Sequence, residues 1–190
     1  FPTSVKNVDF MSADAHKWLL GPMAIGIVYV KKKNFDLLRP TLLGAWNVRS
    51  PDYITQDTIS FHSTARRYEP GVLNASGIVG FKAVLEMIQK IGLVTISERL
   101  LLLKSNLVSQ LESLGYKIHG PKDGINASSI TTFNHEKQKA SIVFEKLNEA
   151  GIVSSCRKNR QGEEFLRFSP HFYNTEREID QAVGVLAKLS

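Results

Sequence analysis

The strongest pattern in the sequence is a pair of consecutive amphipathic helices in the middle of the chain. Apolar residues recur every three or four positions over 75–91, and again over 100–114. This spacing places the apolar side chains on one face of each helix, so both helices need a core to pack against. Gly92 separates the two stripes, and Gly115 suits the position just after a helix end. The pattern predicts two amphipathic helices in succession, the second one following Gly92.

The residues after these helices alternate between strand and helix patterns. Two Thr–Glu pairs at capping-box spacing, Thr95 with Glu98 and Thr175 with Glu178, predict helix starts. The expected elements are strands over Tyr116–His119, Ser128–Phe133, Ile152–Cys156 and Phe165–Ser169, and helices over 139–150 and 175–189. This mixture predicts a small α+β domain.

The residues before the helices do not form a self-sufficient domain. A strand is expected over Val8–Ser12, and a buried strand over Gly26–Val30, which three lysines end. The stretch Leu37–Tyr68 carries turn residues without a helical period, so we expect a long irregular connection. Two strands and a loop cannot bury both faces of a sheet. We therefore expect the chain to be part of a longer protein, with residues 1–80 ending a larger domain and residues 81–190 forming a second one.

Composition excludes several classes of protein. Of the 190 residues, 43% are hydrophobic, which is too many for a disordered chain. No apolar run approaches the ~20 residues that a membrane span needs, so no membrane contact is expected. The net charge of +6 is dispersed over the sequence, which argues against a nucleic-acid partner. Cys156 is the only cysteine, which fits a cytoplasmic setting, and the histidines lack metal-ligand spacing, so no metal is expected.

Lys17 is the first candidate for chemistry, within the segment Ser12–Pro22. It follows a predicted strand and precedes a Gly-Pro turn and the apolar strand. Burial in such a setting would favour the neutral amine, which attacks carbonyl groups to form a Schiff base. The alternative is a lysine that extends past a core tryptophan into water.

Three segments together resemble the class V aminotransferases, the pyridoxal-phosphate enzymes that include cysteine desulfurases and selenocysteine lyases. Ser12–Pro22 is similar to the family's cofactor-lysine segment, in which His-Lys precedes a Gly-Pro turn. Arg67–Asn74 is similar to its Arg-aromatic-Glu-x-Gly-Thr-x-Asn segment, and Leu166–Thr175 to its Arg-x-Ser-x-x-x-Tyr-Asn-Thr element. The three occur in the family's order.

The resemblance implies an α/β fold of the fold-type I class of pyridoxal-phosphate-dependent transferases. The chain would hold the end of the large, mostly parallel-sheet domain and the complete small C-terminal α+β domain. It also implies pyridoxal 5′-phosphate as cofactor, a homodimer, and a small-molecule amino-acid substrate. The Asp that binds the pyridinium nitrogen and the residue that stacks on the cofactor ring would lie in the N-terminal half of the full-length protein, which this chain lacks.

The resemblance also implies roles for individual residues. Lys17 would bind the cofactor as a Schiff base and then move the substrate Cα proton, and His16 would reach towards the cofactor phosphate. Arg167 would bind the substrate α-carboxylate, because a guanidinium matches two oxygens. Arg67 and Asn74 are expected to shape their loop.

Some positions depart from the family pattern. Asp14 stands where desulfurases have a phosphate-binding Ser, and Val72 replaces a Thr that donates to the phosphate across the dimer interface. Desulfurases carry sulfur on a loop cysteine shortly before the carboxylate-binding Arg, but 157–166 contains no cysteine. Cys156 itself falls on a predicted strand, where thiols are usually inert.

These observations favour transamination or lyase chemistry at the Cα of an amino acid. Two alternatives stay open. One is a carbon–sulfur or carbon–selenium lyase of the desulfurase or selenocysteine lyase type. The other is a non-catalytic relative that keeps only the fold and the dimer interface, which Asp14 and Val72 favour.

Overall fold

The computed structural model describes residues 7–49 and 57–189, and divides them between two compact units. The first unit ends at Lys90 and the second begins at Ile91. The division predicted at residue 80 stays a prediction. Part of the predicted irregular connection, residues 50–56, lies outside the described residues.

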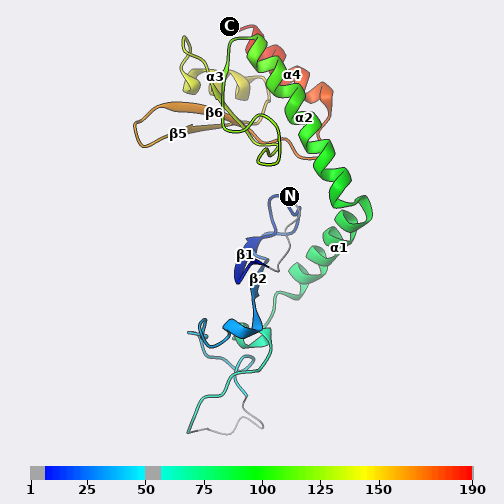
Figure 1. Ribbon diagram of the computed structural model, residues 1–190, viewed down its shortest axis with the longest axis vertical. Coiled ribbons are helices and arrows are strands. Elements are labelled where there is room, and N and C mark those ends of the chain that lie inside the picture. The colour runs from blue at the N-terminus through cyan, green and yellow to red at the C-terminus, as the bar shows by residue number, and fades with distance from the viewer. Residues whose placement is uncertain (1–6, 50–56, 190) are drawn as a thin grey trace. The chain divides into compact units, whose positions relative to one another are not determined.

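The first unit contains a two-stranded antiparallel sheet and one long helix (Figure 1). Strand β1 (Phe10–Asp14) pairs with β2 (Gly26–Val30), so that Asp14 lies opposite Gly26. Helix α1 (Ala75–Ile91) borders a groove of about 440 Å³ that β2 also lines. The irregular chain between β2 and α1 contains two short 3-10 helices, η2 (Lys32–Asn34) and η4 (Ala65–Tyr68).

The second unit contains a four-stranded antiparallel sheet in the order β3-β4-β6-β5. Its strands are β3 (Lys117–His119), β4 (Thr131–Asn134), β5 (Ser155–Lys158) and β6 (Glu164–Phe168), and its helices are α2 (Leu93–Ser113), α3 (Ala140–Glu149) and α4 (Glu176–Ala187). The contacts of α3 with β5 and β6, and of α2 with β3, build a layer of helix against the sheet.

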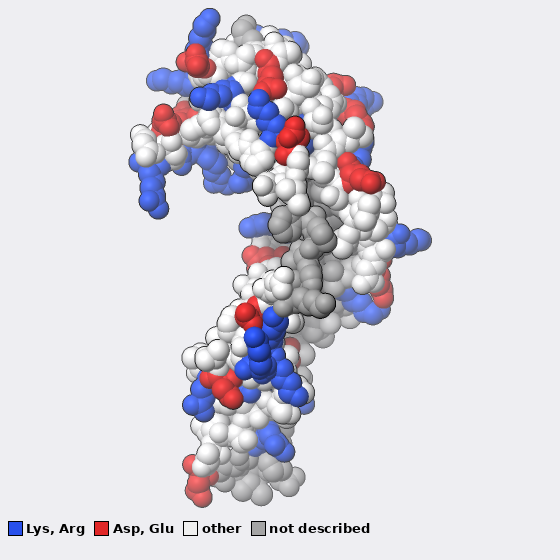
Figure 2. All heavy atoms as spheres, in the orientation of Figure 1, with Lys and Arg blue, Asp and Glu red and all other residues white. Residues whose placement is uncertain are grey.

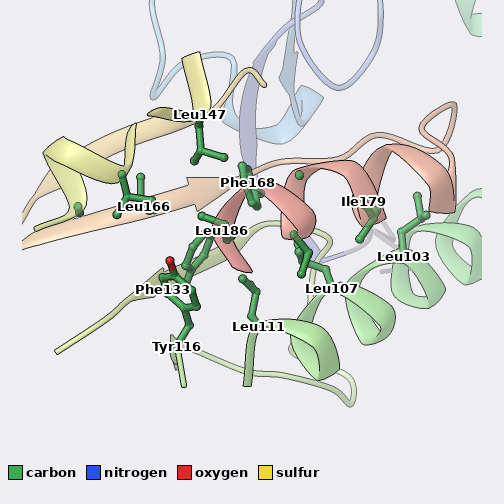
Figure 3. Close-up of a cluster of buried hydrophobic side chains, with 14 residues drawn as sticks. Leu103, Leu107, Leu111, Tyr116, Phe133, Leu147, Leu166, Phe168, Ile179 and Leu186 are labelled. Carbon is green, nitrogen blue, oxygen red and sulfur yellow. The ribbon is translucent and has the colours of Figure 1, made fainter. Parts of the chain in front are cut away.

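A single apolar core joins these helices to the sheet (Figure 3). Leu107 and Leu111 from α2 meet Phe133 from β4, Leu166 from β6 and Leu186 from α4, all of them at most 1% exposed. Because strand side chains alternate between faces, Phe133 and Leu166 fix which face of the sheet turns to the helices. The strand residues on either side of them therefore point to the opposite face.

The structure corrects three details of the sequence prediction. Helix α2 follows Gly92 as predicted, but Gly92, with φ +91°, stands at its N-terminal cap, so the capping box expected from Thr95 and Glu98 does not form. The strand expected over Ile152–Cys156 begins instead at Ser155, and Val153 is 92% exposed. The strand predicted to be buried, β2, is mostly exposed, because β1 is the only strand it pairs with among the described residues.

Truncation of the α2 core residue Leu107 to Ala should destabilise the second unit by about 2–5 kcal/mol, because it leaves a cavity in a fully buried cluster. Leu102→Ala on the same helix is the matched control, since Leu102 is 58% exposed and should change stability by no more than about 0.5 kcal/mol. Urea denaturation followed by circular dichroism measures both. Equal effects of the two substitutions would contradict this assignment of the core.

Candidate functional site

Lys17 lies on a tight turn that directly follows β1. Ala15 is fully buried, its N–H donates to the carbonyl of Ile25 at 3.0 Å, and its own carbonyl accepts from the N–H of Gly21 at 2.8 Å. The carbonyl of Lys17 accepts from the N–H of Leu20 at 3.0 Å. These backbone bonds close the chain on itself, so the position of Lys17 follows from the strand pairing.

Two residues of this segment adopt a left-handed backbone conformation. Leu20 has φ +55° and Ala24 has φ +58°, although neither is a glycine. Such conformations are costly for residues with a Cβ and persist only where the surroundings enforce them. They flank the Gly21-Pro22 turn, so tertiary contacts must hold the backbone here in a conformation that these residues do not favour on their own.

Helix α1 supplies the surroundings that enforce this turn. A Cβ on Gly21 would lie 2.6 Å from the Cβ of Ala15 and 3.1 Å from Phe81, and a Cβ on Gly80 would lie 2.7 Å from Pro22. The two glycines therefore allow the turn and the helix to touch. Asn74 adds a polar link, because its Nδ2 donates to the carbonyl of Ala24 at 3.2 Å.

The second sequence segment, Arg67–Asn74, has a structural role. The side-chain Oδ1 of Asn74 accepts from the N–H of Gly77 at 2.9 Å and thereby caps the start of α1. The guanidinium of Arg67 lies 5.0 Å from the ring centre of Phe35 and 5.7 Å from that of Phe61. Both residues shape the loop, as the sequence predicted.

Lys17 and His16 are both exposed. The sequence argument placed Lys17 in an apolar setting, which the described residues do not provide. Among these residues, the Lys17 amine has no hydrogen-bond or ion-pair partner. Asp14 and Val72, the two departures from the family pattern, are exposed as well.

Arg167 lies in the second unit, on the face of the sheet that turns away from the core. The register aligns four polar residues across the strands: His119, Thr132, Arg167 and Ser155. Arg167 thus has a hydroxyl side chain on either side. Its Nε is buried and has no hydrogen-bond partner among the described residues. A buried guanidinium nitrogen of this kind calls for an acceptor, which a bound carboxylate would provide.

The segment after Arg167 is fixed by a network that the sequence only partly revealed. The Oδ1 of Asn174 accepts from the N–H of His171 at 2.8 Å, and the Thr175–Glu178 capping box starts α4 as predicted. Arg99 on α2 donates to the carbonyl of Asn174 at 2.8 Å and forms a fork with the Glu176 carboxylate. Sequence reasoning missed Arg99, because nothing distinguishes it from other polar residues on a helix.

Cys156 lies on β5 opposite Leu166 and packs against the core. Burial, followed by the nearby Glu164 carboxylate, raises the pKa of its thiol, which disfavours the reactive thiolate. The turn that joins β5 to β6 is closed by Asn159, whose N–H donates to the Glu163 carbonyl at 3.0 Å and whose Oδ1 accepts from the Glu163 N–H at 2.9 Å. This short closed turn contains no thiol.

Among the residues that the structure describes, no group of three His, Cys, Asp or Glu side chains is placed to hold a metal ion. No described helix has both the length and the apolarity to cross a membrane.

Comparison with known proteins establishes the family. The family model for aminotransferase class-V matches residues 3–182, and the chain belongs to this family, as its three sequence segments indicated. A probable cysteine desulfurase of Pyrococcus abyssi is 26% identical over 96% of the chain, and the uncharacterized aminotransferase YcbU of Bacillus subtilis is 25% identical over 98%. A cysteine desulfurase of Escherichia coli is 30% identical over 96%.

Solved structures show the same fold. The apo structure of a cysteine desulfurase from Thermococcus onnurineus superposes on 95% of the chain with a TM-score of 0.85 and 24% identity. A NifS-like protein matches 96% of the chain with a TM-score of 0.73 and 25% identity. The predicted α/β fold class is thereby confirmed. The chain spans about half the length of the curated relatives it matches, 47% for the archaeal protein.

Substitution of Gly21 by Ala should destabilise the first unit by about 1–3 kcal/mol, because the added methyl group would overlap Ala15 and crowd Phe81. Gly71→Ala is the matched control, since a Cβ there meets nothing within 4 Å. Thermal unfolding and amide hydrogen exchange over 14–26 measure the effect. Unchanged exchange in the Gly21 variant would contradict the close contact of the turn with α1.

The Arg99–Glu176 contact predicts that the stability of the second unit depends on pH. Hydrogen bonds from Arg99 lower the pKa of the Glu176 carboxyl from 4.5 to about 2. Because the folded pKa is depressed, the stabilisation is present above the unfolded value and lost as the pH falls from about 4.5 to about 2. Glu176→Gln should lose less stability over this window than the parent, as measured by urea denaturation at several pH values.

Glu164 serves as the internal reference for that experiment. Its pKa is also about 2, chiefly because Ser141 donates hydrogen bonds to its carboxylate. The Glu176 variant should therefore keep part of the acid sensitivity. Identical pH profiles for parent and variant would show that the fork on Arg99 does not form in solution.

Proposed function

We propose that the chain is the C-terminal half of a pyridoxal-phosphate-dependent enzyme that acts at the Cα of an amino-acid substrate. The observation that carries the proposal is the family match over 3–182, which includes both the Lys17 turn and the Arg167 strand. Transamination or lyase chemistry fits these residues. The homodimer, the cytoplasmic setting and the lack of a nucleic-acid partner, all expected from the sequence, belong to the same proposal.

Lys17 is proposed to hold the cofactor and to move the substrate proton. Its amine is exposed and unpaired among the described residues, on a turn that β1, β2 and α1 hold in place. A primary amine of this kind fits the cofactor aldehyde. When bound, pyridoxal phosphate supplies an electron sink for the negative charge that develops at Cα. His16, the adjacent residue, is proposed to face the cofactor phosphate.

Arg167 is proposed to orient the substrate. Its guanidinium lies between the Thr132 and Ser155 positions, and its buried Nε lacks an acceptor among the described residues. A substrate α-carboxylate would satisfy that nitrogen in a bidentate contact and fix the direction of the Cα–H bond. Arg99 would act as a positioning residue, because it holds the segment after Arg167 against α2.

A cysteine desulfurase remains the second candidate, because relatives named as such match most of the chain. The core-facing Cys156 does not support sulfur transfer through an enzyme thiol. A carbon–sulfur lyase that eliminates sulfide from the β-carbon, with pyruvate and ammonia as the other products after hydrolysis, needs no such thiol. Release of sulfide and pyruvate in equal amounts from cysteine by the full-length protein, unchanged in Cys156→Ser, would favour this carbon–sulfur lyase over transamination.

Lys17→Ala should abolish cofactor attachment to the full-length protein. Reduction with borohydride in the presence of pyridoxal phosphate should fix one cofactor per chain on Lys17, as detected by peptide mass spectrometry. Lys82→Ala is the matched control, because Lys82 is also an exposed lysine of the first unit, and its amine pairs with Glu86. Failure of the parent protein to take up cofactor would instead support a non-catalytic relative, which Asp14 and Val72 favour.

A further inference from the structure

The face of the four-stranded sheet that turns away from the core forms a continuous polar surface. We name it the open face, and it consists of every second residue of each strand. Its members are Lys117, His119, Thr132, Asn134, Ser155, Arg157, Phe165 and Arg167. The contacts among them confirm the assignment, because His119 bonds to Asn134 at 2.8 Å and its ring meets Phe165 at 4.8 Å.

Arg157 is the diagonal neighbour of Arg167 on this face. Ser155 pairs with Arg167 and Arg157 pairs with Phe165, so Arg157 lies one step further along β5 on the same side. Diagonal neighbours across a strand pair lie about 7–8 Å apart at the backbone, within reach of two long side chains. Two guanidinium groups can therefore converge on one small molecule.

Neither guanidinium is neutralised by the described residues. Arg157 and Arg167 form no ion pair or hydrogen bond there, and the open face carries no Asp or Glu. The nearest carboxylate on β6, Glu164, points to the helix side, where it binds Ser141 and Lys158. Glu163, at the turn just before β6, has the same strand parity as Phe165, and its carboxylate accepts from the Nδ2 of Asn159 rather than from either arginine. Two unpaired cations attract an anion, and each guanidinium matches the two oxygens of a carboxylate.

The short turn between β5 and β6 gives Arg157 a defined position. Asn159 closes the turn through its backbone and side chain, and Lys158 pairs with Glu164 on the other side of the strand. Figure 2 shows Lys and Arg atoms projecting from this hairpin. Because the strand is tied on its core-facing side, Arg157 presents its charge on the open face.

We propose that Arg157 is a specificity-determining residue, which binds the side-chain carboxylate of a dicarboxylic amino acid while Arg167 binds the α-carboxylate. The inference rests on the proposed function, since it assigns the substrate class of the same site. A four- or five-carbon dicarboxylic amino acid, or the matching keto acid as amino acceptor, carries the two carboxylates that such a pair of guanidinium groups would bind.

The test compares acids with their isosteric amides. The full-length protein, loaded with pyridoxal phosphate, is titrated with L-aspartate, L-asparagine, L-glutamate, L-glutamine and O-phospho-L-serine in a calorimeter. The parent should bind an acid at least about tenfold more tightly than its amide, the size expected for a charge-assisted contact. Arg157→Gln should abolish that preference without weakening the amide, whereas Arg167→Gln should weaken acid and amide alike.

Two control variants separate the effect of the Arg157 guanidinium from a general loss of positive charge on the hairpin. Arg157→Lys keeps the charge and should retain part of the preference, and Arg160→Gln, on the exposed turn of the same hairpin, should retain all of it. An unchanged acid preference in Arg157→Gln, or no preference in the parent, would overturn the inference while leaving the proposed function intact. A preference for phosphoserine alone, with no preference for aspartate or glutamate over their amides, would overturn the assignment of a dicarboxylic substrate. Absence of any amino-acid binding would overturn the proposed function itself.

Discussion

The arrangement of the first unit depends on the close contact between α1 and the turn that carries Lys17. Gly21 and Gly80 bring Ala15, Pro22 and Phe81 to distances that any additional side-chain atom would prevent. This packing offsets the cost of the left-handed conformation at Leu20 and Ala24. The flexible Lys17 side chain therefore starts from a rigid backbone, as the residue proposed to hold the cofactor would need.

In the second unit, a sheet rather than a turn fixes the position of the candidate site residue. The helices of this unit pack against one face only, where Phe133 and Leu166 are buried. Strand alternation then projects Thr132 and Arg167 from the opposite face at positions that the core itself determines. The fork of Arg99 on Glu176 adds a second constraint just beyond β6. The same apolar packing that stabilises this unit therefore orients the groups proposed to bind substrate.

The sequence predicted the elements whose signals are local. The 3.6-residue period located α1, the Thr175–Glu178 pair located the start of α4, and the Lys17 turn followed from its Gly-Pro sequence. The sequence prediction failed for features that are determined by tertiary contacts. Val153 belongs to an apolar run typical of a strand, yet the register with β6 starts β5 at Ser155. The exposure of β2 and the role of Arg99 likewise depend on partners far along the chain, which periodicity does not reveal.

The alternation of side chains along β5 determines both where the only cysteine of the chain lies and which charges accompany Arg167. Cys156 pairs with Leu166 and turns to the core, where burial raises the pKa of its thiol, whereas Arg157, the next residue, turns to the open face. A shift of the register by one residue would exchange the two and place a thiol beside Arg167. The closed turn at Asn159 and the Lys158–Glu164 ion pair both act against such a shift. This register turns the Cys156 thiol away from the open face and places Arg157 on it beside Arg167, which is why we propose a doubly charged acid as the substrate.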